Sequence, residues 1–170
     1  MSSAPYPSNE AQRQMALDSY GILDTLPEQR YDDLTDLAAY ICDTPIALIS
    51  LIDNDRQWFK SHHGLSMTQS ERAISFCAHS LLNPEDIMVV SNAHTDHRFA
   101  DNPLVRAEPN IHFYAGAPLL TPEKLPLGTI CVISHTAKML SEHQVNSLRA
   151  LARQTMALLE FGKLEKATEK

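Results

Sequence analysis

The stretch Pro45-Ile-Ala-Leu-Ile-Ser-Leu-Ile-Asp53 decides the fold of this chain. Its residues from Ile46 to Ile52 are apolar apart from one serine, and they lie between a proline and the turn-forming residues Asp53-Asn-Asp55. An apolar, β-branched run with breakers at both ends indicates a strand buried on both faces. Gln57-Trp-Phe-Lys-Ser61 follows at hairpin distance, so we expect the two segments to pair as antiparallel neighbours.

Two helices are expected before this hairpin. Ser8 is positioned to cap a helix that runs to about Tyr20, where Gly21 supplies a left-handed stop. Thr25-Leu-Pro-Glu28 is a capping-box pattern, with Pro27 expected in the first turn of the second helix. One apolar stripe at helical spacing should face the core from that helix: Tyr31, Leu34, Leu37, Ala38 and Ile41.

A second hairpin and a long helix are expected toward the C-terminus. Strands over 112–120 and 127–134 should be joined by a longer turn. On the first of these strands, alternation places Tyr114 on the face opposite to Phe113. Ser141 should cap a final helix that ends near residue 165.

The connection over residues 65–111 is irregular. It has room for a short helix at 75–82 and a short strand at 87–90, but most of it is polar and rich in His, Asp, Asn and Pro. A long irregular stretch inside a compact domain usually has a function. Because hairpins dominate over parallel crossovers, the whole pattern predicts an α+β domain built on an antiparallel sheet.

Composition and charge exclude several classes of protein. The 170 residues are 44% hydrophobic and 21% charged, which is typical of one globular domain. No apolar run approaches the roughly 18 residues of a membrane span. A net charge of −7 disfavours nucleic acid as a partner. The three scattered cysteines form neither a disulfide framework nor a metal-binding pair, so we expect a reducing, cytoplasmic setting.

Seven motifs, in order along the chain, resemble those of GAF domains, the small-molecule-sensing modules of signalling proteins. The likeness is greatest to the N-terminal GAF domains placed ahead of histidine kinase or GGDEF output domains in bacteria. The motifs are Leu23-Asp-Thr-Leu-Pro-Glu28, Pro45-Ile-Ala-Leu-Ile-Ser-Leu-Ile-Asp53, Arg56-Gln-Trp-Phe-Lys-Ser61, Ser75-Phe-Cys-Ala-His79, Asp96-His-Arg-Phe-Ala-Asp-Asn-Pro-Leu-Val105, Phe113-Tyr-Ala-Gly-Ala-Pro-Leu119 and Leu127-Gly-Thr-Ile-Cys-Val-Ile133.

The resemblance implies a GAF-like, PAS-related antiparallel sheet of five to six strands with helices on both sides. It divides the chain into an N-terminal helix or arm (1–20), the GAF domain (21–160) and a C-terminal helix extension (161–170). It also implies a non-catalytic sensor domain of bacterial signal transduction, whose small-molecule ligand shifts the terminal helices. It does not identify that ligand, because GAF pockets serve chemically diverse molecules.

The ligand pocket is expected beneath residues 65–111. Seven residues of that cover and of the strand below it are predicted to line the pocket: Phe76, His79, Asp96, Arg98, Phe99, Asn102 and Tyr114. An arginine fork suits a carboxylate or phosphate, and tyrosine offers an apolar ring with one polar group. Two structural alternatives stay open: an Asp96–Arg98 pair that only fixes the loop, and plain core packing of Tyr114.

Cofactor sites are considered at two places and expected at neither. Cys77-Ala-His79 could attach a bilin, but a free cysteine on a short helix is more typical of a core thiol. His94 and His97, with the pair His62-His63, lack further ligands nearby in sequence, whereas zinc sites take three or four. We therefore expect neither bilin, haem nor metal.

The final helix suggests a homodimer through the terminal helices. Its apolar seam keeps a three-four spacing that suits a helical partner, with the N-terminal helix as companion: Leu148, Ala152, Thr155 and Leu159. Two other classes of function remain as alternatives. One is a redox enzyme of the free methionine sulfoxide reductase type, and the other is a dimerisation module without a ligand.

Overall fold

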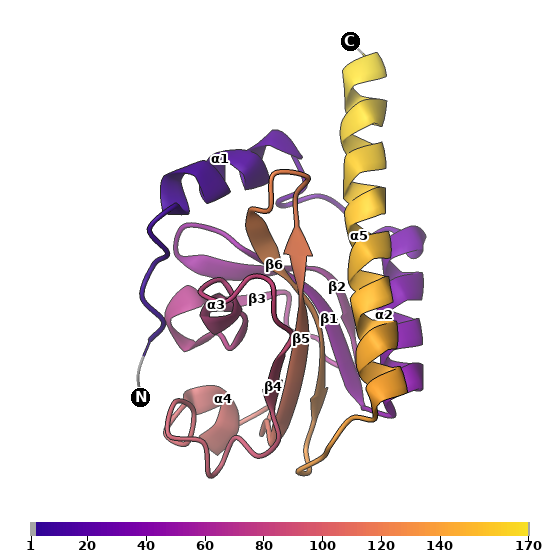
Figure 1. The fold of residues 1–170 in the computed structure, drawn as a ribbon. Coiled ribbons are helices and arrows are strands. Elements are labelled where there is room, and N and C mark those ends of the chain that lie inside the picture. Colours follow the sequence, from indigo (N-terminus) through magenta and orange to yellow (C-terminus); the bar gives the residue numbers. More distant parts are fainter. Residues whose placement is uncertain (1–2, 170) are drawn as a thin grey trace.

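The computed structural model describes residues 3–169, and Figure 1 shows their arrangement. In chain order the elements are α1 (Glu10–Ser19), α2 (Gln29–Cys42), β1 (Ile46–Ile52), β2 (Arg56–His63), β3 (Gln69–Glu71), the 3-10 turn η1 (Arg72–Ile74), α3 (Cys77–Ser80), β4 (Met88–Val90), α4 (Pro103–Arg106), β5 (Phe113–Leu120), β6 (Pro126–Ser134) and α5 (Glu142–Thr168). The predicted α+β class and both predicted hairpins are confirmed.

The six strands form one antiparallel sheet in the order β3-β2-β1-β6-β5-β4. The deciding strand β1 lies at its centre, fully buried, between β2 and β6. The backbones of the paired strands β1 and β6 approach closely at Gly128, where a Cβ atom would lie 1.9 Å from the carbonyl oxygen of Ser50. Only glycine fits there, because any side chain would collide with the backbone of the neighbouring strand.

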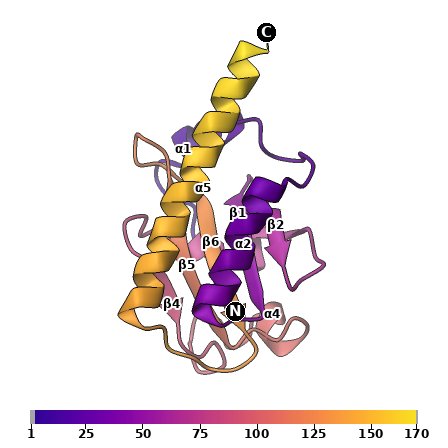
Figure 2. The same ribbon diagram turned by 90° about the vertical axis from the view of Figure 1, so that its right-hand side faces the viewer.

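Helices cover both faces of the sheet, as expected. Helices α2 and α5 lie side by side on one face, which we call the helix face (Figure 2), while α3, α4 and the loops around them cover the other, the cover face (Figure 1). The predicted alternation along β5 is confirmed, since Phe113 belongs to the apolar cluster of the helix face and Tyr114 to that of the cover face. Strands β5 and β6 therefore contact both layers.

Three local predictions for the first two helices are wrong. Helix α1 begins after Asn9, so Ser8 is not its cap. Helix α2 begins at Gln29, and Pro27 precedes the helix instead of lying in its first turn. Leu37 is exposed, whereas Tyr31 and Ala38 of the predicted stripe are buried together with Cys42. The small side chains of Ala38 and Cys42 let α2 pack closely on the sheet.

Helix α5 confirms its predicted cap and corrects its predicted seam. The Ser141 hydroxyl accepts a hydrogen bond from the Gln144 amide, and the Gln144 side chain closes the capping box. All four seam residues are buried. Leu148, Ala152 and Leu159 belong to the helix-face cluster of the same chain, and Thr155 is buried on the same helix. Because α5 packs within the chain on both the sheet and α2, these buried residues are not available to a second copy. The C-terminal part of α5 projects beyond the sheet (Figures 1 and 2).

Among the described residues, none of the helices combines the length and the apolar character needed to cross a membrane.

Candidate functional site

The cover face is held together by an aromatic cluster that contains four of the predicted pocket residues. Phe76 precedes α3 and Phe99 precedes α4; their rings stack with centroids 3.9 Å apart and planes 8° apart. The ring of Tyr114, from β5, lies 5.3 Å from that of Phe76. His79 of α3 meets the Phe99 ring edge-on at 4.8 Å. The structure thus brings together Phe76, His79, Phe99 and Tyr114 from segments far apart in sequence.

The space enclosed between this cover and the sheet is small. Its volume is about 20 Å³, which is roughly the room for one water molecule. The lining is mainly apolar, with side chains of Leu48, Phe59, Phe76, Leu104, Ile111 and Tyr114 among those that surround it. The phenol of Tyr114 also fills the room above Gly116, because a Cβ there would lie 2.5 Å from its oxygen. The packed side chains therefore leave little free volume under the cover.

The three polar residues predicted for the pocket make local contacts in the cover. Arg98 donates two hydrogen bonds to Asp96, at 3.0 and 2.8 Å, and these hold the pKa of Asp96 below its usual value. The Asn102 side chain caps α4 by accepting from the Leu104 amide at 2.8 Å. It also donates to the carbonyl oxygen of Ile74, which ties α4 to η1. None of these contacts tests ligand binding, which stays a prediction for all seven residues.

His79 and Arg98 also line an open cleft beside β4. This cleft has a volume of about 400 Å³ and lies between α3, the Asn83–Ile87 loop and the sheet edge at Val89. The seven predicted residues are therefore divided between a packed aromatic cluster, a cleft at its edge and a helix cap. The sequence predicted one common pocket for all seven, and their shared role in binding a ligand stays a prediction.

The cysteines are buried and their thiols resist ionisation. Burial raises the pKa of Cys42 and of Cys77 to about 11 and that of Cys131 to about 12. A thiolate is the reactive form of cysteine, so these values disfavour nucleophilic chemistry near neutral pH. Within residues 3–169, His, Cys, Asp and Glu side chains form no group of three that could hold a metal ion. His94 instead stacks on His112, with ring centroids 3.8 Å apart.

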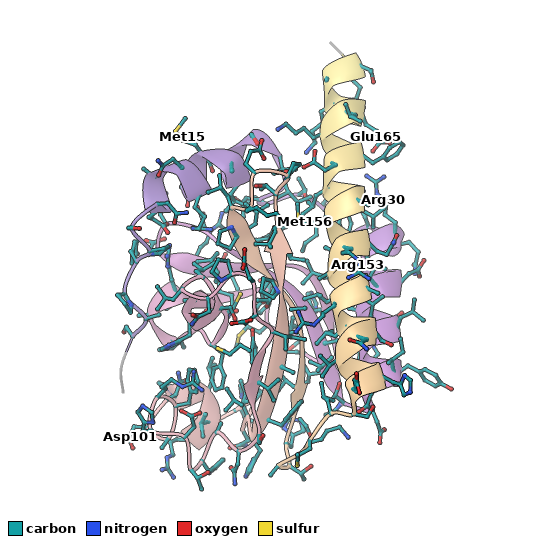
Figure 3. All side chains as sticks on the ribbon, viewed as in Figure 1. Met15, Arg30, Asp101, Arg153, Met156 and Glu165 are labelled. Atoms are coloured by element: carbon teal, nitrogen blue, oxygen red, sulfur yellow. The ribbon has the colours of Figure 1, made fainter. Side chains whose placement is uncertain are left out.

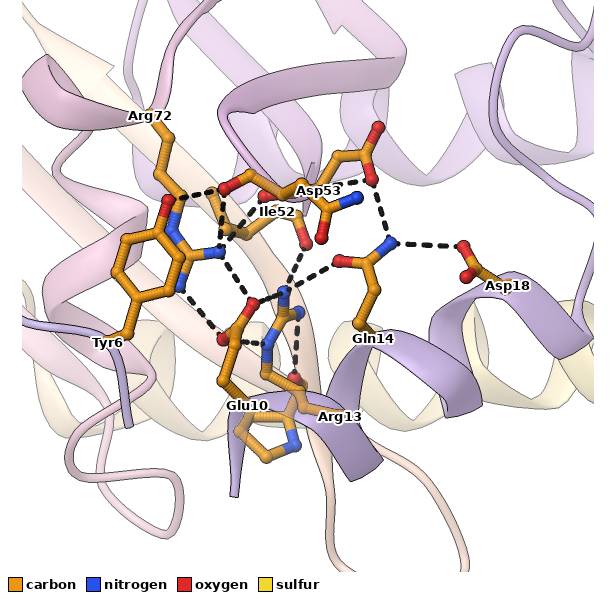
Figure 4. A network of polar contacts seen from close by, with 10 residues as sticks. Tyr6, Glu10, Arg13, Gln14, Asp18, Ile52, Asp53 and Arg72 are labelled. Carbon is orange, nitrogen blue, oxygen red and sulfur yellow. Dashed lines mark hydrogen bonds and ion pairs between the residues drawn. The ribbon is translucent and has the colours of Figure 1, made fainter. Parts of the chain in front are cut away.

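A buried ionic network joins α1 to the cover, and sequence reasoning missed it (Figure 4). The Glu10 carboxylate accepts from Arg13 at 2.9 Å and from Arg72 of η1 at 2.8 Å. Arg13 is fully buried and also donates to the carbonyl oxygen of Ile52 at 2.7 Å. Tyr6 covers the Arg72 guanidinium, 3.8 Å from its ring centroid. In the sequence, only the i,i+3 spacing of Glu10 and Arg13 points to an ion pair. Arg72 lies 62 positions from Glu10, so no local pattern indicates its contact.

Burial alone would raise the pKa of Glu10, but hydrogen bonds and charge attraction from Arg13 and Arg72 outweigh it and lower the pKa to about 2. The carboxylate is therefore ionised throughout the physiological range. Its charge offsets two guanidinium groups that are almost completely enclosed. Such a network makes the position of α1 depend on the position of η1.

A second network fastens the projecting part of α5. Lys60 of β2 is buried and contacts the Glu28 carboxylate at 2.7 Å. Arg30 contacts Glu28 at 3.1 Å and Glu165 of α5 at 2.9 Å. Lys166 donates to the carbonyl oxygen of Tyr20 in the α1–α2 connection. Figure 3 shows Arg30 and Glu165 beside the projecting part of α5. The sheet, the α1–α2 connection and α5 are thus joined by charged groups.

The chain belongs to the GAF domain family, whose model matches residues 26–159. A protein of Pseudomonas aeruginosa named cyclic di-GMP phosphodiesterase is 42% identical to it over 158 residues. That match covers 92% of this chain but only 27% of the relative, so the chain spans about a quarter of the relative's length.

Solved structures of domains from other bacterial proteins share the fold. A domain of a sensor histidine kinase from Sinorhizobium meliloti matches 84% of this chain and 97% of its own, with a TM-score of 0.65 at 17% identity. The GAF domain of a phosphoenolpyruvate-protein phosphotransferase from Acinetobacter matches 90% and 98%, with a TM-score of 0.64 at 18% identity. At these identities the similarity shows the fold alone, and it confirms the GAF-like architecture predicted from the motifs.

Proposed function

We propose that this GAF domain is a non-catalytic regulatory domain of a bacterial signalling protein. A small molecule that binds under residues 65–111 shifts the packing of α5, which passes the change to an output domain. Such a ligand acts only if it binds one arrangement of the helices more tightly than the other. The output is a phosphodiesterase, a GGDEF domain or a histidine kinase. The names of the P. aeruginosa and S. meliloti relatives support the first and the last of these.

One observation supports this proposal above all: β5 and β6 contact the cover on one face and α5 on the other. A change under the cover reaches α5 across the thickness of a single sheet. Buried side chains are closely packed, so a displacement on one face is transmitted instead of being absorbed. The projecting end of α5 then changes its direction relative to the sheet.

The ligand site requires the cover to move. Since the enclosed space has only about 20 Å³, a ligand must displace the ring of Phe76, Phe99 or Tyr114. The open cleft at His79 and Arg98 is the proposed entrance, because it borders the same aromatic cluster. Its histidine and arginine side chains supply polar contacts there, and the displaced rings supply an apolar wall.

Native mass spectrometry of the purified chain, followed by a thermal-shift screen of metabolites, tests the ligand proposal. We expect one small molecule per chain or a stabilising metabolite, and the variant Arg98→Gln with Tyr114→Phe should lose that stabilisation. A matched control, Arg106→Gln, changes a nearby exposed arginine that donates a hydrogen bond to the Ala100 carbonyl oxygen. Full ligand-induced stabilisation in the Arg98 and Tyr114 variant would place the site elsewhere.

A second candidate function is a dimerisation module that binds no ligand. The filled space under the cover favours it, since a packed aromatic cluster needs no ligand for stability. Because the seam of α5 is buried, the homodimer would use the exposed apolar residues Phe161 and Leu164 of the projecting end. Absence of any bound or stabilising small molecule, together with a stable dimer, would favour this candidate.

The redox-enzyme alternative has less support. It requires a reactive thiol, whereas all three cysteines are buried with raised pKa values. We propose a reducing, cytoplasmic setting for the domain, in which these thiols stay unpaired. The division into an arm, a GAF domain and a helix extension also stays a proposal. The ionic network of Glu10 nevertheless joins the arm to the cover.

A further inference from the structure

A second cleft lies on the helix face, apart from everything described above. It is enclosed by α5, the end of β5, the β5–β6 turn and the loop before β4, and its volume is about 420 Å³. It shares no lining residue with the enclosed space under the cover or with the cleft at Arg98. Its volume falls in the range of about 300–1,000 Å³ that is usual for small-molecule sites.

The walls of this cleft are positively charged in a protein of net charge −7. Arg149 and Arg153 of α5 and Lys124 of the β5–β6 turn line it, and Glu85 is the one acidic residue among its lining residues. Three positive charges and one negative charge leave the cleft with a net charge of +2. A dianion would neutralise it.

The two arginines are also exceptional in having no partner. The chain has eight arginines, and six of them donate hydrogen bonds to a carboxylate or a carbonyl oxygen: Arg13, Arg30, Arg56, Arg72, Arg98 and Arg106. Among residues 3–169, Arg149 and Arg153 make no hydrogen bond or ion pair, and both are exposed. They lie four residues apart, which places their Cβ atoms about 5–6 Å from each other, and like charges at this spacing destabilise a helix.

The floor of the cleft is apolar. Three apolar lining residues are almost completely buried: Ala117 of β5 and Ala152 and Met156 of α5. Arg149 and Arg153 are exposed, so the apolar side chains form the deep end of the cleft and the arginines its rim. Arg153 and Met156 lie on the part of α5 that runs beside β5 (Figure 3). A ligand for this site therefore needs an apolar or aromatic body as well as its negative charge.

We propose that this cleft binds a small organic phosphate, with the phosphate between Arg149, Arg153 and Lys124 and the organic body on the Met156 floor. A phosphate monoester supplies two negative charges and oxygens that both guanidinium forks can reach. A dicarboxylate shares the charge but lacks a single tetrahedral centre on which both forks converge. Because the ligand would bridge α5 and the β5–β6 turn, it would hold α5 against the sheet.

Titration with four probes tests this site in the full chain at about 150 mM salt, where weak surface attraction is screened. Adenosine 5′-monophosphate has both the phosphate and an organic body. Inorganic phosphate has the charge alone, and adenosine has the body alone. Succinate is the dicarboxylate control. The readout is the NMR shift of the arginine side-chain Nε–H signals. We expect saturable shifts of the Arg149 and Arg153 signals, with the nucleotide binding more tightly than each of the other three probes.

The variant Arg149→Gln with Arg153→Gln should weaken nucleotide binding about tenfold or more, because two charged hydrogen-bond donors are lost. Lys138→Gln with Lys163→Gln makes the same change in net charge outside the cleft and should leave the affinity within about twofold. Circular dichroism and urea unfolding check that both variants fold. Equal affinity in the arginine variant, or no saturable shift with any probe up to about 5 mM, would overturn the site. Succinate binding as tightly as the nucleotide would overturn its assignment to phosphate.

Discussion

Replacing Glu10 with glutamine should destabilise the domain strongly and in a pH-dependent way. The carboxylate contacts both Arg13 and Arg72, whose side chains are 0% and 4% exposed. Removing one partner from a buried ion network leaves the other charges uncompensated, which costs about 3–5 kcal/mol. The pKa of Glu10 gives a second estimate: lowering it from 4.5 to about 2 is worth about 3 kcal/mol at about 1.4 kcal/mol per unit.

The sign of the pH dependence follows from that lowered pKa. Because the folded state binds the proton of Glu10 more weakly than the unfolded state, the carboxylate stabilises the fold above pH 4.5. This stabilisation is lost as the pH falls from 4.5 through about 2. The difference in unfolding free energy between the wild type and Glu10→Gln should therefore be constant near neutral pH and should shrink below about pH 4.5.

Urea unfolding monitored by circular dichroism, at several pH values from 7 down to 3, measures this difference. At pH 7 we expect Glu10→Gln to lose about 3 kcal/mol, or about 6–12 °C in Tm for a chain of this length. Glu71→Gln, an exposed acid in β3, is the matched control and should stay within about 0.5 kcal/mol of the wild type. If Glu10→Gln loses less than about 0.5 kcal/mol of unfolding free energy at pH 7, the carboxylate does not stabilise the network as described. A difference that stays unchanged down to pH 3 would contradict the lowered pKa of Glu10.

Three further measurements check other parts of the structure. Ser141→Ala should lower the unfolding free energy by about 1 kcal/mol through loss of the α5 cap, with Ser147→Ala as a control, and calorimetry that finds no difference would contradict the cap. The three cysteines should react with a thiol reagent at pH 8 only after denaturant is added; fast labelling of the native protein would contradict their burial. The variant Phe161→Lys with Leu164→Lys should convert a homodimer to monomers in sedimentation equilibrium, because it places charges on the exposed apolar end of α5. If the wild type is already a monomer at tens of micromolar, the dimer is excluded.

The strands were the most predictable part of this fold. The apolar run 46–52 and the alternation at Phe113 and Tyr114 fix both the strands and their faces, because burial in a sheet repeats every two residues. Strand β3 was missed, since its residues Gln69-Ser-Glu71 have no apolar pattern and pair at an exposed edge of the sheet. The seam of α5 was misassigned because a helix that packs on a sheet and one that packs on a helix share their spacing.

The site was predictable only as a region. The motifs led us to expect Phe76, Phe99 and Tyr114 around one pocket, and in the structure their rings form one cluster. The sequence does not show that the rings fill the space between them, because closure depends on how the cover folds back. The contact of Glu10 with Arg72 joins residues 62 positions apart, and no local pattern predicts such a pair.

The proposed function depends on coupling between the cover and α5, which hydrogen–deuterium exchange can measure. Phe99→Leu loosens the aromatic cluster without adding charge, and wild-type protein in urea, adjusted to the same global stability, is the comparison. We expect exchange in the variant to be faster than in the comparison sample for both the cover (residues 65–111) and the end of α5 (residues 158–168). Faster exchange confined to the cover, with α5 unchanged, would contradict the coupling.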